Sequence, residues 1–207
     1  SLTEKAVKNG NIVSRDFFHE DLSFEFDYKI KFKRFQNIDK FHDSCIVKIF
    51  IVDKKTKKQV DSIDLSSLHY YDTVFKNVDN VRSDISGKNK NKENDNLDND
   101  AFGDIIIADF NFDTKEDIAV VRECSNSGNF YNFYIQTSER KFKRDNYLSD
   151  TVVYFPVKIN KINKTLETDV VAGVCGYGEQ IYFFNDKLNN WKLKSHKYIN
   201  DCDNEKK

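Results

Sequence analysis

Residues 22–32 read LSFEFDYKIKF, with an apolar side chain at every even position and a polar one at every odd position. Successive side chains of a β-strand point to opposite faces, so this alternation predicts a strand with one buried and one solvated face. Strands that are wet on one face are typical of antiparallel sheets, whereas strands of parallel sheets read as continuous apolar runs. The stretch therefore indicates an antiparallel sheet packed on one side.

The next part of the chain has the pattern of a β-hairpin. Residues 45–52 (CIVKIFIV) are followed by the charged run DKKTKK at 53–58 and by QVDSIDL at 59–65. Strand, charged turn and strand in this order predict two antiparallel neighbours. Lysines on the turn and on strand edges also oppose aggregation between sheets.

Strand patterns recur to the end of the chain, while helical periodicity is weak. We expect short helices only within residues 61–75 and 140–148, and an all-β or β-rich α+β fold: a twisted antiparallel sheet with hairpins and at most one or two short helices. The further strands are expected at residues 103–107, 117–124, 130–136, 150–159, 169–174, 179–184 and 191–193.

Composition sets the size of the domain and the classes of partner. The 207 residues are 39% hydrophobic and 14% aromatic, which is enough for one core. We expect an N-terminal arm at 1–20, a single domain at 21–200 and a tail at 201–207. The polar run at 84–100 should be a mobile loop without an apolar anchor. The net charge of −1 gives no general attraction to nucleic acid or anionic lipid.

The cysteines and the ends of the sequence give information about the cellular compartment of the protein. Four cysteines without a C-x-x-C pair make a zinc or thioredoxin-like site improbable, and they leave either two disulfides or buried thiols open. No run of 18 apolar residues occurs, so we expect no membrane span. The sequence contains no methionine, so we expect any secretory signal or lipid anchor to lie upstream of Ser1.

An acidic ladder at residues 109–117 (DFNFDTKED) has the spacing of a calcium loop. Oxygen-bearing side chains occupy positions 1, 3, 5 and 9, and position 7 would offer a backbone carbonyl. Calcium takes six to eight hard oxygen ligands, which alternate residues of a curled loop can supply. The predicted ligands are Asp109, Asn111, Asp113, Lys115 and Asp117. Thr114 stands where such loops have glycine, and an acidic turn without metal is the alternative.

A second candidate is the turn SNSGN at residues 125–129, which separates two aromatic-rich strands. As an ordinary hairpin turn it needs no function, because Asn and Gly tolerate left-handed backbone. It also contains the pattern S-G-x-x-Y, in which a narrow tip can enter a cleft, since glycine lets the backbone approach closely. The predicted partner-binding residues are Ser127, Gly128, Asn129 and Tyr131, with Tyr131 bracing the loop.

These motifs together carry a resemblance. The run DFNFDTKEDIAVV resembles the calcium motif of bacterial periplasmic lysozyme inhibitors of the I type, with immunity proteins against secreted peptidoglycan hydrolases among them, and of FG-GAP-like repeats. IFIVDKKTKKQVDSIDL upstream and FYNFYIQ downstream are similar to neighbouring strands of that family. The resemblance covers about residues 22–199. It implies a twisted antiparallel sheet, a calcium site at the acidic loop, and inhibition through protruding loops.

Three functions follow as expectations. The first is a non-enzymatic binding protein of the bacterial envelope or periplasm that inhibits a lysozyme-like hydrolase, with a structural calcium loop. The second is a calcium-stabilised adhesion or recognition module with one FG-GAP-like repeat. The third is an enzyme whose site the sequence does not reveal: the four histidines lack metal spacing, and no G-x-S-x-G elbow occurs.

Overall fold

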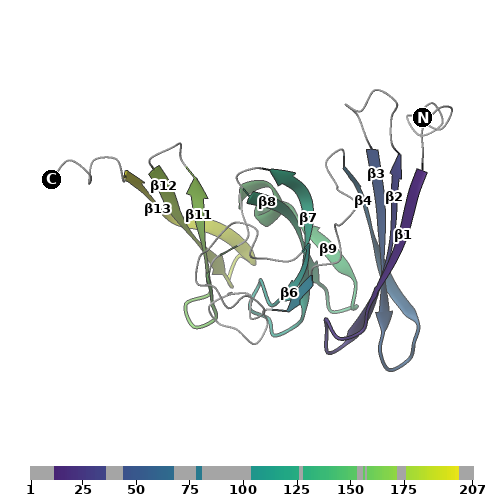
Figure 1. Ribbon diagram of the computed structural model, residues 1–207. Coiled ribbons are helices and arrows are strands. Elements are labelled where there is room, and N and C mark those ends of the chain that lie inside the picture. The colour runs from purple at the N-terminus through teal and green to yellow at the C-terminus, as the bar shows by residue number, and fades with distance from the viewer. Residues whose placement is uncertain are drawn as a thin grey trace.

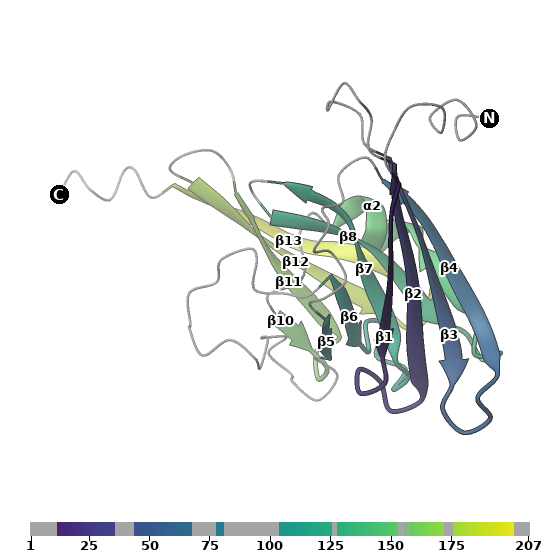
Figure 2. The same ribbon diagram turned by 45° about the vertical axis from the view of Figure 1, so that its right-hand side comes forward.

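The computed structural model describes residues 12–35, 44–67, 78–80, 104–125, 128–152, 156, 158–171 and 176–200. These residues form three sheets that follow one another along the chain (Figure 1). Figure 2, turned by 45°, shows the same succession from a second side. The all-β expectation is confirmed, with one short helix among the described residues.

The first sheet is an antiparallel meander in the order β1-β2-β3-β4. The apolar residues of the alternating pattern form the buried face of this sheet, as the sequence predicts. Tyr28 pairs with Ile51 and Ile30 pairs with Ile49, and all four side chains are fully buried. The predicted hairpin is confirmed as well. The strands are β1 (Ile12–His19), β2 (Phe26–Phe35), β3 (Ser44–Asp53) and β4 (Gln59–Ser67).

The second sheet has the order β5-β6-β7-β8-β9, with β5 and β6 parallel and the other pairs antiparallel. All four residues of β6 are buried, as are residues 118–121 of β7. Strands covered on both faces read as continuous apolar runs, which suits a sheet that lies between two others (Figure 1). Its elements are β5 (Val78–Asn80), β6 (Ile105–Ala108), β7 (Asp117–Ser125), β8 (Gly128–Gln136), β9 (Phe142–Asp145) and the helix α2 (Asn146–Thr151).

The third sheet is an antiparallel meander in the order β10-β11-β12-β13. Leu166, Tyr182 and Trp191 are its buried anchors, whereas residues 192–198 of the edge strand are exposed. Its strands are β10 (Lys158–Asn160), β11 (Thr165–Val171), β12 (Gly176–Asn185) and β13 (Asn190–Asn200).

Several boundaries differ from those expected. The N-terminal arm does not reach residue 20, because Ile12–His19 pair with β2 as an edge strand. The helix expected in 61–75 is wrong over its first part, where β4 continues to Ser67. Of the strand expected at 150–159, the described residues hold the end of α2 at the start and β10 at the end. Residues 1–11, 84–100 and 201–207 lie outside the described residues.

The first two sheets are joined by a buried carboxylate. Glu116, at 0% exposure, accepts hydrogen bonds from the hydroxyl of Ser23 and from the backbone N–H groups of Phe24 and Glu25. Three donors replace the water that this carboxylate loses on burial, which is the condition for burying it. The acidic loop is thus fixed against the first sheet immediately before β7 begins.

Candidate functional site

The acidic loop connects β6 to β7 and curls tightly. Phe112 and Thr114 have φ angles of 61° and 73°, in the left-handed region. Thr114 therefore adopts the conformation that glycine normally supplies at this position, and a β-branched residue is strained there. Phe110 is fully buried and Phe112 packs on Trp191, with ring centroids 5.8 Å apart. The two phenylalanines point into the core, as the sequence predicts.

Side-chain oxygens of the loop accept its own backbone N–H groups. Asp109 Oδ1 accepts from the N–H of Asp113 at 3.0 Å, and Asp109 Oδ2 from that of Thr114 at 3.0 Å. Asn111 Oδ1 accepts from Asp113 at 3.2 Å. Asp113 Oδ1 accepts from the N–H of Lys115 at 2.9 Å, and Asp113 Oδ2 from its ammonium at 3.0 Å. These bonds hold Asp109, Asn111 and Asp113 around one turn of backbone.

Asp117 has a different part in the loop. Its side chain is fully buried, and its two oxygens accept from the N–H groups of Phe110 and Gln136, each at 2.8 Å. Phe110 belongs to the loop and Gln136 ends β8. Asp117 therefore ties the loop to the β7–β8 hairpin.

The carboxyl groups of the loop have shifted pKa values. Burial raises the pKa of Asp109, and the negative charge of Asp113 adds to this rise, against the hydrogen bonds from Thr114 and Asp113. Burial raises the pKa of Asp117 well above its usual value, despite its two N–H donors. Burial also acts on Asp113, but the hydrogen bonds and charge of Lys115, with Asn111, outweigh it and lower the pKa.

The donor set fits calcium in kind, because carboxylate, carboxamide and carbonyl oxygens are the ligands that this ion prefers. Two buried carboxyls with raised pKa values would also be stabilised in their charged form by a nearby cation. Within the described part of the chain, no three His, Cys, Asp or Glu side chains form a cluster able to hold a metal. Coordination by the predicted ligand set would therefore require the carboxyl groups of the loop to move closer together, with Asn111, the Lys115 carbonyl and water completing the set.

The second predicted site lies at the other end of the same hairpin. β7 ends at Ser125 and pairs there with Gly128, the first residue of β8. Ser127 lies outside the described residues, and so do the side chains around it. Tyr131 is 2% exposed and stands opposite Val121. It braces the stem of the hairpin from within, and it offers no surface to a partner.

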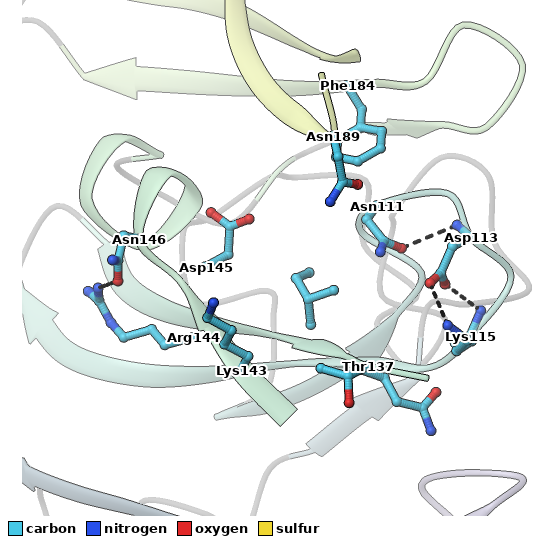
Figure 3. Close-up of a pocket in the computed structure, with 12 residues that line it drawn as sticks. Asn111, Asp113, Lys115, Thr137, Lys143, Arg144, Asp145, Asn146, Phe184 and Asn189 are labelled. Atoms are coloured by element: carbon cyan, nitrogen blue, oxygen red, sulfur yellow. Dashed lines mark hydrogen bonds and ion pairs between the residues drawn. The ribbon is translucent and has the colours of Figure 1, made fainter. Parts of the chain in front are cut away.

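A pocket that sequence reasoning missed lies beside the acidic loop. It has a volume of about 490 Å³. Figure 3 shows Asn111 and Asp113 on one side of the space, Asp145 and Asn146 on the other, and Phe184 with Asn189 above. No pattern in one segment could have revealed it, because its walls come from two sheets. The lining is completed by Lys115, Ile135, Gln136, Thr137, Lys143 and Arg144.

Comparison with known proteins adds little about function. No family model matches the chain, and no curated protein matches it. A solved structure described as a Xanthomonas type IV secretion system related protein superposes with a TM-score of 0.49 and 13% identity, over 94% of this chain and 84% of that one. A likeness of that size carries no argument about function. Among the described residues, no helix is long and apolar enough to cross a bilayer.

Proposed function

We propose that the protein is a non-enzymatic binding protein of the bacterial envelope that inhibits a lysozyme-like, peptidoglycan-cleaving hydrolase. The observation that carries the proposal is the construction of the β7–β8 hairpin. One end is fixed by Asp117, which bonds both the acidic loop and the end of β8. The other end, at residues 125–128, is the turn that the sequence singles out as a narrow tip.

The stem of this hairpin is rigid, which favours insertion into a cleft. Residues 118–121 are buried, and Phe133 packs edge-on against Phe110 with ring centroids 5.0 Å apart. A preorganised element loses little conformational entropy when it binds, so more of the contact energy appears as affinity. A flexible loop of the same sequence would bind more weakly.

The tip has the chemistry to occupy a hydrolase cleft. Lysozyme-like enzymes cleave with two carboxyl groups, one protonated and one ionised, that face each other across an open groove. The hydroxyl of Ser127 and the backbone N–H groups of Gly128 and Asn129 would donate hydrogen bonds to such groups. Gly128 permits close approach because it has no side chain.

Calcium is the proposed stabiliser of the hairpin base. Asp109, Asn111, Asp113, the carbonyl of Lys115 and Asp117 would supply its oxygen ligands. A ligand that binds only the folded state stabilises it by about 2.7 kcal/mol at a hundredfold excess over Kd. Metal-free protein should therefore melt at a lower temperature in chelator than in calcium, and equal melting temperatures would remove calcium from the proposal.

The inhibitor role is tested with Gly128→Trp in an assay against a panel of lysozymes. The bulky side chain should abolish inhibition by clashing within the cleft while leaving the melting temperature almost unchanged. Lys55→Trp is the matched control, because Lys55 is an exposed residue of the β3–β4 turn. It should inhibit like the parent protein.

Two results would count against the proposal. If Gly128→Trp inhibits as well as the parent, the tip is not the inhibitory element. If the parent inhibits no lysozyme of the panel, the calcium-stabilised recognition module becomes the better account. That module would bind a surface ligand and leave hydrolases unaffected.

A further inference from the structure

We propose that the pocket between the acidic loop, β9 and the β12–β13 turn binds a short, neutral saccharide. Pockets that take small molecules span about 300–1,000 Å³, and this one measures about 490 Å³. The proposal concerns a different part of the molecule from the hairpin tip. It does not depend on inhibition of a hydrolase.

The charges of the pocket wall favour a neutral ligand. The ammonium of Lys115 lies 3.0 Å from the carboxylate of Asp113, and Arg144 lies 2.7 Å from that of Asp150. The other two charged side chains of the lining, Asp145 and Lys143, carry opposite charges, and neither forms an ion pair in the described part of the chain. In metal-free protein, an anion or a cation would therefore find no net charge of opposite sign to bind.

The unused polar groups suit hydroxyl groups of a sugar. Asp145 Oδ1 caps α2 by accepting the N–H of Leu148 at 2.9 Å, while Oδ2 has no partner among the described residues. The amide of Asn189 and the ammonium of Lys143 likewise make no hydrogen bond within that part of the chain. A hydroxyl donates one bond and accepts two, so it can pair with a carboxylate and with an amide or ammonium at once.

The apolar part of the lining completes the match. Phe184 and Ile135 line the same space in which Asp145 and Asn189 stand (Figure 3). Phe184 is held by Trp191, with ring centroids 5.3 Å apart and planes at 60°. A sugar ring carries polar hydroxyls at its edge and C–H groups on its faces, so it can satisfy polar and aromatic walls together. A phosphate has no apolar face to offer.

The experiment is a titration of isotope-labelled protein, followed by amide NMR shifts, with diacetylchitobiose, maltose and inorganic phosphate as probes. We expect saturable shifts with a disaccharide at residues 143–146 and 184–189. The double variant Lys143→Met with Asn189→Gly removes both unused donors. Asn189 is exposed with φ 48°, which glycine accommodates without strain. Loss of two hydrogen bonds should weaken binding about tenfold.

Lys187→Met is the control for lost charge, because Lys187 is exposed in the same turn but does not line the pocket. It should bind the disaccharide like the parent. If the double variant does not fold, Lys143→Met alone at its exposed position should still weaken binding. The proposal is overturned if neither disaccharide gives saturable shifts, if phosphate saturates the same residues instead, or if the variants bind undiminished.

Discussion

The turn at residues 53–58 and the loop at residues 109–117 both fold around a buried aspartate that accepts hydrogen bonds from its own segment. In the turn, Asp53 accepts from the N–H and hydroxyl of Thr56 and also pairs with Arg140. In the loop, neither Asp109 nor Asp117 forms an ion pair within the described part of the chain. Asp53 is thus paired directly with a cation, whereas the charge of Lys161 acts on Asp109 without forming an ion pair among the described residues.

The pKa values express the same difference. The hydrogen bonds of Thr56 and Arg140 lower the pKa of Asp53 below 3.8, whereas burial raises those of Asp109 and Asp117 above it. A buried carboxylate is stable only when donors or a cation replace its water. The turn at residues 53–58 therefore holds its buried carboxylate with groups of the protein alone. We propose that the loop at residues 109–117 would be stabilised further by a cation from the solvent.

The largest expected effect comes from Asp117→Ala. This change removes the carboxylate that accepts from the buried N–H groups of Phe110 and Gln136, and each such loss costs about 1–3 kcal/mol. We expect a loss of about 3 kcal/mol in the free energy of unfolding, measured by urea denaturation. Asp113→Ala, in the half-buried part of the same loop, should cost about 1 kcal/mol or less. Equal losses would contradict the anchoring role of Asp117.

Arg140→Met should have the next largest effect on stability. It removes the partner of Asp53 and the cation that lies 4.8 Å from the ring of Phe26. We expect a clear fall in melting temperature, smaller than that of Asp117→Ala, because Arg140 is partly exposed. A double-mutant cycle with Asp53→Asn should give a favourable coupling energy. Additive effects would mean that the two side chains do not stabilise each other.

The pH dependence of stability should separate the two segments further. Because the pKa of Asp53 is lowered, its contribution is present above pH 3.8 and is lost as the pH falls through the folded-state value. The difference in unfolding free energy between parent and Asp53→Asn should therefore shrink on acidification below pH 3.8. A difference independent of pH would show that the charge of Asp53 is not what stabilises the turn.

In metal-free protein the loop should behave in the opposite sense. The raised pKa values of Asp109 and Asp117 mean that protonation favours the folded state. Their contribution is present below pH 3.8 and is lost as the pH rises through the raised values. Calcium should remove that loss by favouring the ionised carboxylates. Urea denaturation across this pH range, with calcium and with chelator, measures the effect.

The smallest expected effect is an increase in stability. Thr114→Gly relieves a β-branched residue at φ 73° but adds chain entropy to the unfolded state. The balance should stabilise the protein by about 0.5 kcal/mol. Thr137→Gly, at a position without positive φ, should only destabilise. If Thr114→Gly also destabilises, the loop conformation at this residue is not strained.

Much of the fold could be predicted because its pattern is local. The apolar–polar alternation of residues 22–32 reflects which face of one strand is buried. The turn at residues 53–58 is recognised from its lysines and from the strand patterns on either side of it. The curl of the acidic loop was likewise readable from alternating oxygens. The edge strand β1 escaped prediction because its exposed and half-buried positions alternate, but its apolar and polar residues do not follow them: Ile12 and Phe18 are exposed, and Arg15 is half-buried.

The remaining features depend on residues far apart in the chain. Glu116 bonds residues 23–25, and Arg140 bonds Asp53; no spacing within one segment encodes such pairs. The pocket takes Asp145 from the second sheet and Asn189 from the third. Asp117 reads as a calcium ligand in the sequence, whereas the structure also assigns it the N–H group of Gln136. Such roles appear only when strands are placed beside each other.

The proposal that the acidic loop binds calcium from solution can be examined by calorimetric titration of metal-free protein with calcium. We expect saturable binding of one ion, accompanied by release of protons at mildly acidic pH because the pKa values of Asp109 and Asp117 are raised. Binding should be lost in Asp109→Asn with Asp113→Asn and retained in Asp64→Asn, an exposed carboxylate of β4. Absence of calcium binding by the folded parent protein would show that the acidic loop is a turn without metal.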